Sequence, residues 1–142
     1  MDKTALFFQC LSFTSSVHRV THELTQPAKP ASITQVQYDM LMHIAVNQPV
    51  TVSELSDCQH MSLPNTSREL RKLSEKSLIE KVSDEEDKRR QHIRLSNEGQ
   101  ALMNEVLMHM QAGFQERLRQ TSEEDVEEIS RALGMLQTKM FY

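Results

Sequence analysis

The sequence predicts a mainly α-helical fold of six helices with one small β-hairpin, and two observations support this prediction. Apolar residues recur at three- and four-residue steps through most of the 142-residue chain, as expected for helices that bury one face. Residues 79–96 instead alternate apolar and polar residues on both sides of a highly charged tip, which is typical of a hairpin. The helices therefore lie before and after a single β element.

The composition favours a globular protein, because 38% of the residues are hydrophobic and 25% are charged. Only three glycines are present, which argues against a glycine-rich phosphate loop, and no catalytic motif points to an enzyme or a cofactor. No apolar run is long enough to span a membrane, so we expect a cytoplasmic protein. The two cysteines, Cys10 and Cys58, lack zinc-finger spacing, which argues against a structural zinc site.

The first two helices are separated by a segment that contains two prolines. Apolar residues at helical spacing predict the first helix over residues 4–24, and residues 26–30 interrupt it. Thr34 and Gln37 have the spacing of a capping box, in which each side chain bonds the other residue's backbone N–H. A second helix should therefore begin there and end near residues 47–49.

A third and a fourth helix should follow a short extended piece at residues 50–52. Thr51 and Glu54 form a second capping box, which predicts a third helix through about residue 60. Pro64 is tolerated in the first turn of the fourth helix, where its missing N–H is not needed. At about 100° per residue, this helix has an apolar side and a side rich in hydrogen-bond donors. The inward residues are predicted to be Leu63, Thr66, Leu70, Leu73 and Ser77, and the outward ones Pro64, Asn65, Arg68, Arg71, Lys72 and Glu75.

Two long helices are predicted after the hairpin. An apolar stripe from Leu102 to Leu118 indicates the fifth, and the sixth begins at Thr121 or Ser122, each followed by an acid three residues later. Both apolar faces are wider than a short chain needs for its own core. We therefore expect a homodimer in which a second copy covers them.

Positive charge is concentrated in the fourth helix and the hairpin. Residues 62–96 carry nine basic and seven acidic residues, a net charge of +2, whereas residues 1–61 and 97–142 have net charges of −2 and −4. An arginine-tipped hairpin beside a helix with an outward basic row is the arrangement of a winged helix-turn-helix that binds double-stranded DNA. We expect this domain at residues 34–96, and a helical dimerisation region at residues 1–33 and 97–142.

Four segments carry a family resemblance: ITQVQY at residues 33–38, VTVSEL at 50–55, RELRKLSEKSLI at 68–79, and DKR at 87–89 followed by IRLSNEG at 93–99. With the order of the elements, they make the chain resemble the MarR family of bacterial transcriptional regulators. Ser77 stands where the family usually has glycine, and Thr66 and Glu69 stand where it usually has apolar residues. The resemblance implies a homodimeric repressor that binds a palindromic operator and is released by a small effector.

The predicted DNA-contacting residues are Ser62, Asn65, Ser67, Arg68, Arg71, Lys72, Asp87, Arg89 and Arg90. Asn65 and Arg68 are expected on base edges, because the first turns of a recognition helix enter the major groove, where Arg pairs with guanine and Asn with adenine. Arg89 is expected in the minor groove, with Asp87 bracing its guanidinium through a bidentate pair. The remaining residues of the set are expected on the DNA backbone.

The resemblance also implies an effector pocket on the first, second and fifth helices. Its candidate residues, for a small aromatic or apolar effector, are Phe13, Tyr38, Met42 and Met110. Two alternatives stay open: a redox sensor that uses Cys10, although no nearby base would activate its thiol, and a winged helix that contacts only proteins. Histidines such as His18 and His22 are too scattered to predict a metal site.

Overall fold

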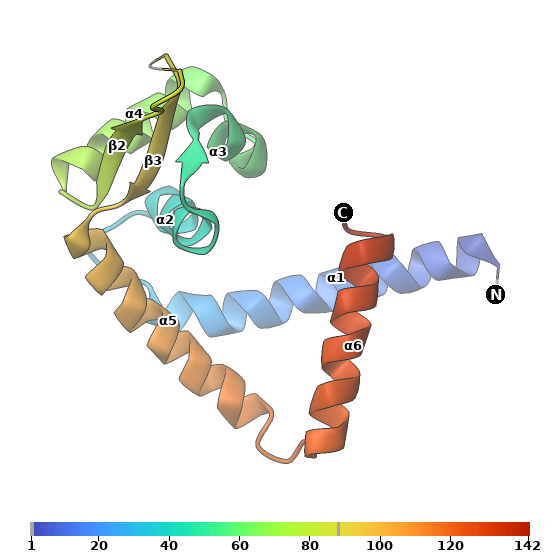
Figure 1. The fold of residues 1–142 in the computed structure, drawn as a ribbon. Helices are drawn as coiled ribbons and strands as arrows, with labels where there is room; N and C mark the ends of the chain where they lie inside the picture. The colour runs from blue at the N-terminus through green and yellow to red at the C-terminus, as the bar shows by residue number, and fades with distance from the viewer. Residues whose placement is uncertain (1, 88) are drawn as a thin grey trace. The chain divides into compact units, whose positions relative to one another are not determined.

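The computed structural model describes residues 2–87 and 89–142, so Lys88 of the predicted wing tip lies outside the described residues. The chain forms two compact units, Met1–Met110 and Gln111–Tyr142 (Figure 1). Within the described parts of the chain, no helix combines the length and apolar character needed to cross a bilayer. In chain order the elements are α1 (Lys3–Thr25), a 3-10 turn (Gln26–Ala28), α2 (Gln35–Asn47), β1 (Val50–Thr51), α3 (Val52–Gln59), α4 (Leu63–Glu75), β2 (Ile79–Ser83), β3 (Gln91–Leu95), α5 (Asn97–Arg117) and α6 (Glu123–Lys139).

Both predicted capping boxes are present and fix where two helices begin. The Gln37 backbone N–H donates to Thr34 Oγ1 and the Thr34 backbone N–H donates to Gln37 Oε1, each at 3.2 Å. Thr51 and Glu54 exchange the same pair of hydrogen bonds at the start of α3, each at 3.1 Å. These bonds satisfy backbone donors that a helix start otherwise leaves unpaired.

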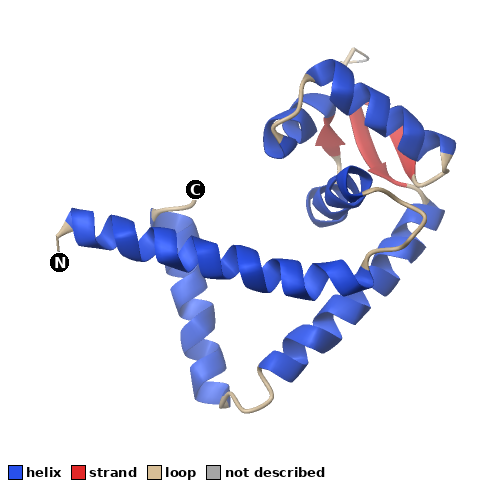
Figure 2. Ribbon diagram, turned by 180° about the vertical axis from the view of Figure 1, so that it is seen from behind, coloured by secondary structure: helices blue, strands red, loops and turns tan. Residues whose placement is uncertain are grey.

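The three strands form one antiparallel sheet in the order β1-β3-β2, which lies among α2, α3 and α4 (Figure 2). Ile79 lies opposite Leu95 in the hairpin, as the alternation predicts, and Val50 of β1 lies opposite Ile93. The sequence predicted the extended piece at residues 50–52 but not its pairing with β3. This pairing joins the start of α3 directly to the wing.

One hydrophobic core in the amino-terminal unit holds these elements together. Its members come from the segment before α2 and from α2, β1, α3, α4, β2, β3 and α5. They are Ile33, Tyr38, Met40, Leu41, Ile44, Val50, Leu55, Leu70, Leu73, Ile79, Ile93, Leu95, Met103 and Val106.

The turn after α4 is a Schellman motif with a serine in the left-handed position. The Ser77 N–H donates to the Ser74 carbonyl at 2.9 Å, and the Leu78 N–H donates to the Leu73 carbonyl at 3.1 Å. Ser77 has φ = 61°, a conformation that glycine adopts without strain. The sequence predicted Ser77 on the inward face of α4, and this prediction is wrong. Ser77 instead lies in the turn that ends the helix, at the position where the MarR family usually has glycine.

The start of α5 is locked to the same turn. The Ser96 N–H donates to the Leu78 carbonyl at 3.0 Å, and the Ser96 hydroxyl donates to the Ser77 carbonyl at 2.6 Å. Ser96 Oγ also accepts a hydrogen bond from the Gly99 N–H at 3.0 Å and thus caps α5. Gly99 is buried, because its α-carbon packs directly against Leu78.

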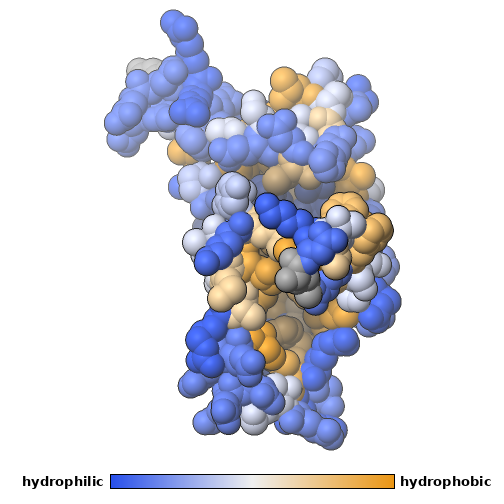
Figure 3. All heavy atoms as spheres, turned by 90° about the vertical axis from the view of Figure 1, so that its right-hand side faces the viewer, coloured by the Kyte–Doolittle hydropathy of each residue, from blue (hydrophilic) through white to orange (hydrophobic). Residues whose placement is uncertain are grey.

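The helices α1 and α6, each considered by itself, leave their apolar residues at the surface. None of the residues in either helix, all of which the structure describes, is buried. Figure 3 shows one face of the molecule, on which apolar side chains (orange) are exposed among hydrophilic ones. Ser122 caps α6 by accepting the Asp125 N–H at 3.1 Å, which decides between the two predicted starts of this helix.

Candidate nucleic-acid interface

The orientation of α4 is fixed by the side chains that it buries. Ser62 caps the helix by accepting the Asn65 N–H at 3.2 Å, and Thr66, Leu70 and Leu73 have no exposed surface. The Thr66 hydroxyl donates to the Ser62 carbonyl at 2.9 Å, so a polar side chain is buried without an unpaired group. The opposite face of α4 must therefore point toward solvent.

Leu63 was predicted on the inward side of α4, and this prediction is wrong. Its side chain is 52% exposed, because Leu63 is the first residue of the helix and lies beyond the core that Thr66 reaches. An apolar side chain thus lies beside the polar outward face.

The predicted DNA-contacting residues of α4 form one exposed surface. Asn65, Ser67, Arg68, Arg71 and Lys72 are all exposed. Arg68 Nη1 donates to Asn65 Oδ1 at 3.3 Å, so the two residues predicted on base edges lie side by side.

Glu69 restrains one basic residue of this surface, which the sequence did not predict. Glu69 Oε1 pairs with Lys72 Nζ at 3.2 Å, and Glu69 Oε2 accepts a hydrogen bond from Gln37 Nε2 at 3.4 Å. Glu69 thereby connects the outward face of α4 with the buried amide of α2. A signal was present in the sequence, since Glu69 departs from the apolar residue usual at this position of the family.

The wing tip is held by backbone hydrogen bonds. The Asp84 N–H donates to the Arg90 carbonyl at 3.0 Å, and the Arg90 N–H donates to the Asp87 carbonyl at 2.9 Å. Asp87 Oδ1 accepts the Arg89 backbone N–H at 3.0 Å, and the two side chains form no ion pair among the described residues. The predicted bracing of the Arg89 guanidinium by Asp87 is therefore wrong. Asp87 instead shapes the turn, because an aspartate side chain readily bonds the N–H two residues on.

Asp84 closes the base of the wing tip. Its carboxylate accepts the Glu86 backbone N–H at 3.0 Å, and His92 Nε2 lies 3.4 Å from its other oxygen. These hydrogen bonds, the one from Glu86 first, lower the pKa of Asp84 below its usual 3.8, because they favour the charged carboxylate.

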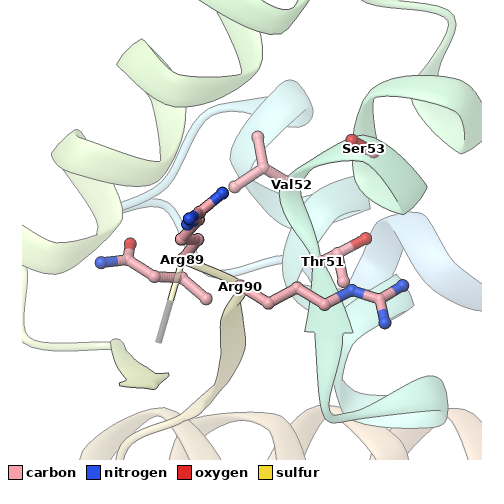
Figure 4. A pocket seen from close by; sticks show the side chains of 6 residues that line it. Thr51, Val52, Ser53, Arg89 and Arg90 are labelled. Carbon is pink, nitrogen blue, oxygen red and sulfur yellow. The ribbon is translucent and has the colours of Figure 1, made fainter. Parts of the chain in front are cut away.

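A cavity of about 350 Å³ lies between the wing and the amino end of α3. Its lining residues are Thr51, Val52, Ser53, Arg89, Arg90 and Gln91 (Figure 4). Figure 4 shows the side chains of Arg89 and Arg90 extending in different directions from neighbouring positions, with Arg90 running beneath Thr51. The residues from β1 and α3 were missed in the sequence, because the pairing of β1 with β3 brings them here.

The predicted effector residues lie on three helices and differ in exposure. Phe13 on α1 is exposed, whereas Met42 and Met110 are half-buried against the core. Tyr38 is buried, and its hydroxyl donates to the Thr25 carbonyl at 2.7 Å. Burial raises the pKa of Tyr38 above its usual 10, and the negative charge of Asp39 adds to this effect. The pocket itself stays a prediction.

The two cysteines differ in environment. Cys10 is half-buried on α1, Cys58 is exposed on α3, and the two are not joined by a disulfide. Among residues 2–87 and 89–142, no group of three or more His, Cys, Asp or Glu side chains is placed to hold a metal ion.

Comparison with known proteins identifies the domain that carries this surface. Residues 31–90, which include α2, α3, α4 and the β2 strand of the wing but not β3, match the model of the MarR family. These residues form a MarR-family domain. Comparison of the chain with curated proteins gives no match.

Solved structures of MarR-family proteins share the fold over nearly the whole chain. A MarR family protein from Bacillus stearothermophilus matches with a TM-score of 0.75 and 22% identity, covering 100% of this chain and 99% of that one. Staphylococcus aureus MarR, in complex with salicylate and kanamycin, matches with a TM-score of 0.68 and 25% identity, over 94% and 91% of the two chains. A mutant of S. aureus MepR bound to an oligodeoxyribonucleotide matches with a TM-score of 0.58 and 24% identity, over 90% and 97%. The protein therefore has the fold of a MarR-family transcriptional regulator.

Proposed function

We propose that this MarR-family protein is a homodimeric transcriptional repressor that binds a palindromic DNA operator. The single observation that carries the proposal is the outward face of α4. Thr66, Leu70 and Leu73 are fully buried, so Asn65 and Arg68 are held toward solvent on a rigid helix. A helix presented in this way can enter the major groove and contact base edges. The MepR mutant of the same fold was solved bound to an oligodeoxyribonucleotide.

The wing supplies the second contact. Arg89 is exposed at its tip and is assigned to the minor groove, where narrow A/T segments attract arginine. Arg90 is assigned to a phosphate, because the cavity that it lines also holds Thr51 and Ser53 at the amino end of α3. Hydroxyl groups and the free N–H groups of a helix start are suitable donors to phosphate oxygens.

Arg71 and Lys72 are assigned to phosphates. Lys72 Nζ lies 3.2 Å from Glu69 Oε1 and pairs with it, so a contact between Lys72 and DNA must compete with this ion pair. Ser62 uses its hydroxyl oxygen to cap α4, which still leaves its O–H able to donate to a phosphate. The exposed Ser67 and the turn-forming Asp87 complete the proposed surface.

Dimerisation is proposed from the unburied apolar side chains of α1 and of the carboxy-terminal unit. Large apolar patches of this kind are rare on the surface of a monomer and mark interfaces. The proposed dimerisation region is residues 1–33 and 97–142, and the proposed winged domain is residues 34–96. The exposed apolar residues are Leu6, Phe7, Phe8, Leu11, Phe13 and Val17 on α1, and Val126, Ile129, Leu133, Met135, Met140, Phe141 and Tyr142 in or after α6.

Release by a small molecule is proposed by analogy with two relatives. S. aureus MarR was solved with salicylate and kanamycin, and S. aureus MepR was solved with ethidium bromide. In a dimer that reads two half-sites about 34–36 Å apart, a ligand can abolish binding by changing that spacing. The energetic coupling expected for such a device is about 1–3 kcal/mol.

The test starts from DNA fragments retained by the purified protein, which are sequenced to give the operator. Arg68→Ala should relax preference at one base position per half-site and cost about 1–3 kcal/mol there. Arg89→Ala should weaken binding to all duplexes, and more to those with A/T-rich flanks, because Arg89 is assigned to the minor groove. Arg131→Ala, an exposed arginine of α6, is the matched control and should change neither quantity.

Two results would contradict the proposal. If no DNA is retained, or if binding does not weaken with salt, the winged domain contacts proteins instead, because only phosphate contacts release counterions. If Arg68→Ala and Arg89→Ala lose affinity equally on operator and random DNA, the assignment of Arg68 to bases is wrong.

A further inference from the structure

The amino end of α4 carries an apolar edge beside its polar outward face. Leu63, the first residue of the helix, is 52% exposed, and the next residue, Pro64, is exposed as well. The first residue that α4 buries is Thr66, one turn further on. The core therefore does not account for a leucine at the start of this helix.

The backbone at this end of the helix offers few donors to a phosphate. A helix start usually binds anions through its unpaired N–H groups. In α4, however, Pro64 has no N–H, and the Asn65 N–H already donates to Ser62 Oγ at 3.2 Å. The Thr66 N–H donates to the Ser62 carbonyl at 2.9 Å. Among the residues of this first turn, all of which the structure describes, only Leu63 keeps an N–H for a further acceptor.

An apolar group at this place suits a base edge better than a phosphate. The amino-terminal residues of a recognition helix contact base edges in the major groove. Side chains of an α-helix lean toward its amino terminus, so the Leu63 side chain reaches further in that direction than those of Asn65 and Arg68. Thymine presents an apolar 5-methyl group in the major groove, which no other unmodified base of DNA has. Contact between leucine and this methyl group removes apolar surface of both from water.

We propose that Leu63 contacts the 5-methyl group of one thymine in each half-site of the operator and thereby selects thymine at that position. The inference rests on the proposed function, because it requires the amino end of α4 to lie in the major groove. It adds to the hydrogen-bonded positions of Asn65 and Arg68 one position that is read by apolar contact alone. Since apolar contact releases no counterions, the preference for thymine should not change with salt concentration.

The test uses the intact protein and operator duplexes in which one thymine at a time is replaced by deoxyuridine. This replacement removes only the 5-methyl group and leaves the hydrogen-bonding atoms of both grooves unchanged, so the contacts assigned to Arg68 and Arg89 are kept. At one position in each half-site, it should weaken binding of the wild-type protein about threefold to tenfold, as expected for the loss of one buried methyl group.

Variants of Leu63 show whether this side chain makes the contact. Leu63→Ala should bind the thymine and uracil duplexes equally, at about the affinity of the wild-type protein for the uracil duplex. Leu63→Gln, whose side chain is polar but of similar size, should also lose the preference, which separates the apolar contact from the volume of the side chain. Leu63→Met should keep the preference, because methionine is apolar and of similar length. Val46→Ala, which truncates a 70% exposed apolar residue of α2, is the matched control and should keep the preference in full.

Two results would overturn the inference while the proposed function stands. One is an operator to which the protein binds with the same affinity whichever thymine is replaced. The other is a preference for thymine over uracil that persists in both Leu63→Ala and Leu63→Gln, because another residue then contacts the methyl group. If the protein binds no duplex at all, the proposed function fails and this inference fails with it.

Discussion

Gly99 joins α5 to the winged domain, and its replacement by alanine should destabilise the protein. A Cβ at this position would lie 1.9 Å from the Leu78 carbonyl oxygen and 2.9 Å from the Leu78 carbonyl carbon. Real Cβ atoms essentially never approach another heavy atom closer than 3.0 Å. The backbone at residue 99 and the Leu78 carbonyl would therefore have to separate by about 1.1 Å, from 1.9 Å to 3.0 Å.

The separation would act on hydrogen bonds that share these atoms. The Leu78 carbonyl accepts the Ser96 N–H at 3.0 Å, and Ser96 Oγ accepts the Gly99 N–H at 3.0 Å. Overpacking costs about 1–3 kcal/mol, and a lost hydrogen bond costs about 1 kcal/mol more. Alanine regains about 1 kcal/mol of helix propensity. The expected net loss in the free energy of unfolding is therefore about 1–3 kcal/mol.

Urea unfolding of Gly99→Ala and wild type, at one fixed protein concentration, measures this loss. Gly134→Ala in α6 is the matched control, because a Cβ there meets no atom within 4 Å. The control should gain up to about 1 kcal/mol, since alanine favours the helix. Equal stabilisation of the protein by both substitutions would refute the close approach of α5 to Leu78.

Three further predictions concern stability. Ser77→Gly should raise the free energy of unfolding by about 0.5–1 kcal/mol, since glycine adopts the positive φ of this position without strain; an unchanged urea midpoint would contradict it. Tyr38→Phe should cost about 1 kcal/mol in the same assay, because it removes the hydrogen bond from the Tyr38 hydroxyl to the Thr25 carbonyl, and no loss would contradict this contribution. The bonds from Glu86 and His92 lower the pKa of Asp84, so their stabilisation is present above about pH 3.8 and is lost as pH falls through the folded pKa. Asp84→Asn should therefore destabilise at about pH 7 and converge with wild type near about pH 2, and a gap that persists in acid would refute this.

The order of the helices and the outward face of α4 follow from the sequence, because they depend on local spacing. Apolar residues at a period of about 3.6 select the buried side of a helix, and Leu70 and Leu73 are buried as predicted. Capping boxes involve residues only three positions apart, so the capping box of Thr34 and Gln37 can be predicted directly from the sequence. The alternation of β2 and β3 likewise predicted the hairpin.

The extent of the core was not predictable from the helical period. The period placed Leu63 and Leu70 on one side of α4, but only the packed structure shows that the core ends before Leu63. A two-residue strand such as β1 has no pattern of its own, so its pairing with β3 depends on contacts far apart in the sequence.

The sequence by itself determined which residues of α4 form its exposed polar face. Tertiary structure alone decided that Lys76 is restrained, because its ammonium donates to Gln37 Oε1 of α2. It also decided that Glu69 of α4 accepts a hydrogen bond from Gln37 of α2. The physical reason is that helical and strand periods fix directions, whereas hydrogen-bond partners depend on distances between elements that the chain brings together only on folding.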